Sequence, residues 1–90
     1  MSKKRVKSIM SVRAVIFCKI KHKAMTSVLE YLKKIPEITK LFSLTGQYDV
    51  LAEIEVDTTE KLYESFAEKI DPIPGIIKTN THVVMKSWEK

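Results

Sequence analysis

A short polar turn at residues 45–48 is the feature of this sequence that most constrains its fold, because it separates two strongly apolar runs. Both runs are rich in the β-branched and aromatic side chains that favour strands. Gly46 lies within the turn and supplies the positive φ angle that a tight connection between two strands requires. The pattern predicts a β-hairpin whose strands cover residues 38–45 and 48–56.

The run at residues 11–20 is apolar at both alternating sets of positions. One set contains Ala14, Ile16, Cys18 and Ile20, and the other contains Val15 and Phe17. Successive side chains of a strand point to opposite faces of the sheet. We therefore expect a strand that must be covered on both of its faces.

Two amphipathic helices and one further strand complete the pattern. Apolar side chains at helical spacing predict a first helix over residues 25–35, and the proline that follows ends it. Asp57 or Thr58 is expected to cap a second helix, which ends before Pro72. The last strand is predicted at residues 76–86.

The resulting order, β-α-β-β-α-β, predicts an α+β domain of the ferredoxin-like kind. Right-handed crossovers place both helices on one face of a four-stranded antiparallel sheet. The other face keeps apolar side chains such as Val15, Phe17 and Leu51, and burial of each contributes about 1.5–3 kcal/mol. We therefore predict a homodimer that packs sheet face against sheet face, a dimeric α+β barrel.

The net charge of +5 is concentrated at one end of the chain. Residues 1–10 carry +4 and form a basic N-terminal arm, whereas the remaining 12 basic and 11 acidic residues nearly cancel. A nearly neutral body lacks the broad positive surface of a nucleic-acid-binding domain, so we interpret the arm as solvated. The arm is the first of two predicted regions, and the folded domain at residues 11–90 is the second.

Cysteine usage and hydropathy exclude several classes of protein. Cys18 is the only cysteine, so an intrachain disulfide is impossible. No apolar stretch reaches about 18 residues, and the run at residues 12–20 is interrupted by charge, so neither a membrane span nor a secretory signal is expected. His22 and His82 have no companion ligands at metal spacing, and we expect no metal or other cofactor. These observations predict a cytoplasmic protein.

Two motifs carry a resemblance to a known family. The first is Thr45-Gly46-Gln47-Tyr48-Asp49-Val50-Leu51, and the second is Pro74-Gly75-Ile76-Ile77-Lys78-Thr79-Asn80-Thr81. With an amphipathic helix between them, they resemble the effector-binding domain, or RAM domain, of the leucine-responsive regulator (Lrp/AsnC) family. The resemblance extends from about residue 12 to the end of the chain.

The resemblance implies a sensor of small molecules, commonly amino acids, that takes part in transcription regulation. Members of the family form dimers that assemble into octamers or similar rings. Full-length members also carry a winged helix-turn-helix, which the ten residues before the first strand are too few to build. We therefore expect a stand-alone effector domain without sequence-specific DNA binding of its own, which acts by joining full-length regulators of the family.

The candidate ligand-binding residues come from the two motifs. They are Thr45, Gly46, Gln47, Tyr48, Asp49, Thr79 and Thr81. Asp49 is suited to pair with the ligand ammonium, and backbone N–H groups near Gly46 are suited to bind its carboxylate. The alternative is structural: a glycine serves any such turn, an aspartate beside a hairpin often caps it, and threonines favour strands.

Two other functions stay open at this point. Ferredoxin-like dimers with an apolar cleft also serve small oxygenases and isomerases, although no nucleophile and base stand out in this sequence. The remaining possibility is a structural or nucleic-acid-associated protein that acts through the basic arm. Of the three, the non-enzymatic sensor fits both motifs.

Overall fold

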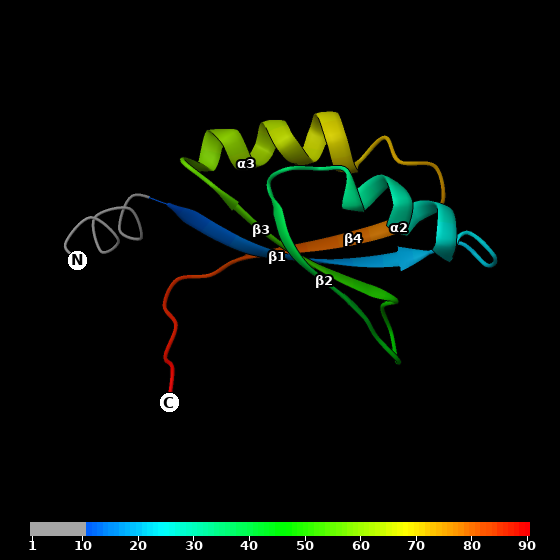
Figure 1. The fold of residues 1–90 in the computed structure, drawn as a ribbon, viewed down its shortest axis with the longest axis horizontal. Coiled ribbons are helices and arrows are strands. Elements are labelled where there is room, and N and C mark those ends of the chain that lie inside the picture. Colours follow the sequence, from blue (N-terminus) through cyan, green and yellow to red (C-terminus); the bar gives the residue numbers. More distant parts are fainter. Residues whose placement is uncertain (1–10) are drawn as a thin grey trace.

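The computed structural model describes residues 11–90, which form one four-stranded sheet and two helices (Figure 1). The elements follow in the order β1 Val12–Ile20, α2 Met25–Lys33, β2 Ile38–Ser43, β3 Val50–Val56, α3 Thr59–Ser65 with its continuation η1 Phe66–Ile70, and β4 Ile76–Val83. The predicted β-α-β-β-α-β order and the ferredoxin-like class are confirmed. The basic arm lies outside the described residues.

The strands are antiparallel and lie in the order β2-β3-β1-β4. The central strands are therefore β1 and β3, and β4 lies at one edge. Both helices cover the same face of the sheet, as Figure 1 shows. None of the helices in residues 11–90 is long and apolar enough to span a membrane.

The core lies between that face and the helices, and strand alternation builds it. Every second residue of β1 from Ala14 to Ile20 is buried, and so is every second residue of β3 from Val50 to Val56. The helices contribute Val28, Leu32, Leu62 and Ile70. This arrangement confirms that the first strand uses one set of its apolar side chains for the core and leaves the other set for the opposite face.

That opposite face, which we call the open face, carries Val15, Phe17, Phe42, Tyr48, Leu51 and His82. The ring of Phe17 lies between its neighbours, with centroid distances of 5.6 Å to Tyr48 and 5.9 Å to His82. Phe42 remains 47% exposed. No element of residues 11–90 covers this face, so its aromatic cluster is accessible.

The strand ends differ from the predicted ones. The hairpin strands end at Ser43 and begin again at Val50, because residues 44–49 form a wider turn that is closed by the N–H of Leu44 donating to the carbonyl of Asp49 at 2.8 Å. The last strand ends at Val83 rather than at residue 86. The N–H of Val84 still donates to the carbonyl of Arg13 at 2.8 Å, one residue beyond the end of the strand.

Polar contacts fix both ends of the second helix. Thr58 is the N-cap, and its hydroxyl accepts a hydrogen bond from the N–H of Lys61 at 3.1 Å, as predicted. The final turn is a π turn, in which the N–H of Asp71 donates to the carbonyl of Phe66 at 2.8 Å. Proline at position 72 then ends the helix.

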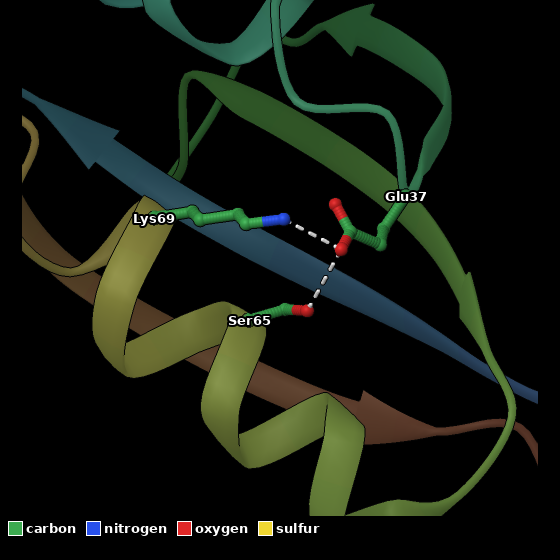
Figure 2. A network of polar contacts seen from close by, with 3 residues as sticks. All are labelled: Glu37, Ser65 and Lys69. Carbon is green, nitrogen blue, oxygen red and sulfur yellow. Dashed lines mark hydrogen bonds and ion pairs between the residues drawn. The ribbon is translucent and has the colours of Figure 1, made fainter.

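An ion pair ties the second helix to the loop before β2 (Figure 2). The Nζ of Lys69 lies 2.7 Å from Oε2 of Glu37, and the hydroxyl of Ser65 donates to the same oxygen at 3.4 Å. The hydrogen bond from Lys69 is the main cause of a pKa of Glu37 below its usual value. The contact links the two halves of the chain, since Glu37 follows the first helix and Lys69 lies on the second.

Candidate functional site

Asp49 holds the hairpin turn against the end of β1. Its N–H donates to the carbonyl of Cys18 at 2.9 Å, and its Oδ2 accepts a hydrogen bond from the N–H of Ile20 at 2.8 Å. The carboxylate thus takes the place that a backbone carbonyl would occupy if the two strands continued to pair. Lys19 lies 3.7 Å from the same oxygen. The structural role that the sequence left open for Asp49 is therefore present.

The second carboxylate oxygen of Asp49 has no such partner. Oδ1 makes no hydrogen bond within residues 11–90, and the side chain is 32% exposed. One oxygen is fixed by the backbone, so the other is held in place with little freedom to reorient. A positioned carboxylate oxygen of this kind is able to accept hydrogen bonds from an ammonium group.

The remaining residues of the first motif make no hydrogen bond or ion pair with the side chain of Asp49. Thr45, Gly46 and Gln47 are exposed in the turn, and Gly46 has the expected positive φ of 103°. Tyr48 lies on the open face against Phe17. Strand β3 begins only at Val50, so the alternation of its side chains does not extend to Tyr48.

Thr79 and Thr81 lie on β4, opposite Cys18 and Ile16 of β1. Directly paired residues share a face, so both threonines lie on the face that carries the helices. Because β1 separates β4 from β3, Thr79 is two strand spacings, about 10 Å, from the backbone beside Asp49. Within one copy, the structure does not bring the two motifs into one compact site.

A cavity of about 450 Å³ adjoins Asp49 at this end of the sheet. It is lined by residues 19–23, Met25, Asp49 and Ile77. Asp49 is the only one of the predicted site residues in this lining. The β1–α2 turn was not among the predicted site residues, although its run Lys21-His22-Lys23 directly after a buried strand was a signal for an anion-binding surface.

The start of the second motif packs closely against the start of α2. Gly75 has φ +102°, and a Cβ there would lie 2.9 Å from Cβ of Ala24 and 2.9 Å from Cγ2 of Val28. Its carbonyl accepts a hydrogen bond from the N–H of Lys21 at 2.7 Å. Glycine is therefore required at this position for the turn before β4 to approach the start of α2.

Burial raises the pKa of the Cys18 thiol to about 11, so this side chain is neutral in the core. Among residues 11–90 there is no group of three or more histidine, cysteine, aspartate and glutamate side chains that is placed to hold a metal ion. What the site offers is a fixed carboxylate oxygen, several lysines and a cavity of small-molecule size.

Comparison with known proteins identifies the family. The model of the Lrp/AsnC ligand binding domain matches residues 13–90. The chain belongs to the Lrp/AsnC family. The resemblance drawn from the two motifs is thereby confirmed, and the chain contains the ligand-binding domain of a family of transcription regulators.

Relatives in this family are named as transcriptional regulators. The HTH-type transcriptional regulator FL11 of Pyrococcus horikoshii is 35% identical over 80 residues, which are 89% of this chain and 52% of that protein. The chain thus spans about half of the length of the curated relatives that it matches.

Solved structures agree with the fold. The crystal structure of FFRP-DM1 has a TM-score of 0.79 and 30% identity, and the match covers 82% of this chain and 99% of that chain. The complex of transcriptional regulator NMB0573 from Neisseria meningitidis with L-Met has a TM-score of 0.84 and 20% identity, over 93% and 56% of the two chains. At 20% identity, the similarity to NMB0573 shows a shared fold.

Proposed function

We propose that this chain is an amino-acid-sensing domain that modulates transcription regulators of its family. The observation that carries the proposal is Asp49, whose Oδ2 is fixed by the N–H of Ile20 while Oδ1 faces no partner within residues 11–90, beside a cavity of about 450 Å³. An amino acid presents an ammonium group that needs such an acceptor once water is removed. A relative of the same fold, NMB0573, is named as a complex with L-Met.

The ligand would be held at both of its charged ends. The ammonium donates to Oδ1 of Asp49, and the carboxylate is bound by backbone N–H groups of the turn at Gly46 and Gln47. The side chain of Gln47 contacts the rest of the ligand. Thr79 and Thr81 lie beyond β1 in the same copy, so we assign their hydroxyls to the site of a neighbouring copy.

Assembly through the open face completes the proposal. The face exposes an aromatic cluster around Phe17, with Phe42 47% exposed, and burial of each such side chain is worth about 1.5–3 kcal/mol. We propose that two copies pack these faces together and that the dimers associate into an octamer or a similar ring. The same face would join this chain to full-length regulators of the family in the cytoplasm.

The alternative functions have less support. An oxygenase or isomerase needs a reactive group, yet the only thiol is buried with its pKa raised to about 11. The basic arm, which the nucleic-acid alternative requires, lies outside the described residues. Neither alternative is favoured by a contact within residues 11–90.

A panel of thermal unfolding experiments tests the proposal. The protein is heated with each of the twenty amino acids, and light scattering on the same samples reports its assembly state. A ligand at a hundred times its dissociation constant adds about 2.7 kcal/mol to the stability of the native state. We expect one amino acid, or one chemical class, to raise the melting temperature and alter assembly. Unchanged melting temperatures at millimolar concentrations would contradict the sensor function.

A further inference from the structure

The cavity beside Asp49 is strongly basic. Lys19, Lys21 and Lys23 line it together with His22, and Asp49 is its single acidic residue. With a neutral histidine the lining carries a net formal charge of +2. The described body of the chain is nearly neutral, so this concentration of positive charge is local to the cavity. An anionic ligand is attracted to such a surface.

Two of the three lysines are available to a ligand. Lys19 lies 3.7 Å from Oδ2 of Asp49 and offsets part of that charge. The ammonium groups of Lys21 and Lys23 make no ion pair or hydrogen bond with any of residues 11–90. Their positive charges are therefore not balanced by the protein that surrounds them.

The backbone that carries these lysines is held in place. The N–H of Lys21 donates to the carbonyl of Gly75 at 2.7 Å, and the N–H of Ala24 donates to the carbonyl of Lys21 at 2.9 Å. Lys23 has a φ of 71°, a left-handed conformation that is rare for a residue with a side chain. The backbone of Lys21 and Lys23 is therefore already ordered before a ligand binds. Less backbone entropy is lost on binding, which lowers its cost in free energy.

The lining also has an apolar part. Met25 lies at the start of α2, and Ile77 is 63% exposed although it belongs to a strand. These side chains offer a surface to methylene groups of a short ligand. The cavity therefore combines one carboxylate, two unpaired ammonium groups and an apolar wall.

We propose that the effector of this domain is an acidic amino acid, L-glutamate or L-aspartate, and that Lys21 and Lys23 determine this specificity. The inference rests on the proposed function, since it assigns the ligand ammonium to Oδ1 of Asp49. The backbone N–H groups at Gly46 and Gln47 are assigned to the α-carboxylate, so the side-chain carboxylate is the group that meets the positive charge of the β1–α2 turn. A neutral amino acid lacks the second carboxylate, and a dicarboxylate without an ammonium group leaves Asp49 unpaired.

Isothermal titration calorimetry at fixed ionic strength tests the inference with four probes: L-glutamate, L-aspartate, L-glutamine and glutarate. We expect L-glutamate or L-aspartate to bind at least about tenfold more tightly than L-glutamine and glutarate. The variants Lys21→Gln and Lys23→Gln should each weaken binding by about tenfold or more, because a hydrogen bond to a charged group is lost.

Lys61→Gln is the matched control, because it removes the same charge from the start of α3, near the opposite end of β3 from Asp49. It should leave the affinity unchanged, and the melting temperatures of all three ligand-free variants should equal that of the parent. Tighter binding of L-glutamine, or unchanged affinity in both turn variants, would overturn the acidic specificity and leave the sensor function standing. Binding of glutarate as tight as that of L-glutamate would refute the pairing with Asp49. The absence of binding by every amino acid of the full panel would overturn both proposals.

Discussion

Gly46 and Gly75 have nearly the same backbone conformation but opposite surroundings. Their φ angles are +103° and +102°. A Cβ at Gly75 would lie 2.9 Å from two side-chain atoms, Cβ of Ala24 and Cγ2 of Val28, whereas a Cβ at Gly46 would have no heavy atom within 4 Å apart from its own chain neighbours. The variants Gly46→Ala and Gly75→Ala therefore separate backbone strain from steric crowding.

The two losses of stability can be worked out from this geometry. A residue with a side chain at positive φ costs about 1–2 kcal/mol, and this cost applies to both variants. Crowding in a packed region adds about 1–3 kcal/mol, and it applies to Gly75 alone because Cβ of Ala24 cannot rotate away. We expect Gly46→Ala to lose about 1–2 kcal/mol and Gly75→Ala about 2–5 kcal/mol of unfolding free energy.

Urea unfolding followed by circular dichroism measures this difference. All samples need the same protein concentration, because association stabilises the folded state by mass action. In a domain of this size a change of 1 kcal/mol shifts the melting temperature by about 4–8 °C, so thermal scans provide a second measurement. Equal losses, or a larger loss for Gly46→Ala, would refute the close packing of the second motif on α2.

Three further predictions concern other parts of the molecule. The pKa of Glu37 is lowered in the folded state by Lys69, so the pair stabilises the fold above the usual glutamate pKa, and this contribution disappears as the pH falls through the lowered value. Lys69→Gln should therefore reduce the loss of unfolding free energy, measured by urea titration, as the pH falls below the usual glutamate pKa, and an unchanged profile would contradict the ion pair. Thr58→Ala should cost about 0.5–2 kcal/mol in the same assay, because the N–H of Lys61 loses its acceptor, and no loss would argue against the cap. Phe42→Asp on the open face should give monomers in light scattering, whereas Tyr63→Asp, at a more exposed aromatic residue of α3, should not; equal effects would contradict the dimer.

The sequence was sufficient to predict the helices and strands, because the spacing of apolar residues follows which side chains each face of a helix or strand buries. The alternation of β3 from Val50 to Val56 and the two-sided pattern of β1 both correspond to observed faces of the sheet. The cap at Thr58 and the turn at Gly46 follow from local chemistry. These features depend on neighbours in the sequence, so periodicity and turn residues reveal them.

Features that depend on contacts between distant segments were not predictable. The side chain of Tyr48 lies on the open face because the strand starts two residues later than the pattern suggested. The turn at Gly75 packs against Ala24 at the start of α2, and the carboxylate of Asp49 accepts a hydrogen bond from a residue 29 positions away. The π turn after Ser65 carries no signal that distinguishes it from an ordinary helix.

The most direct test of the sensor function is the affinity of Asp49→Asn for the amino acid that most raises the melting temperature. Asparagine keeps an oxygen that accepts the N–H of Ile20, so the fold is retained while the charge facing the ligand is removed. The sensor function predicts a loss of affinity of about tenfold or more, with stability in the absence of ligand nearly unchanged. An unaltered affinity in a folded variant would contradict the assignment of Asp49 as the residue that binds the ligand ammonium.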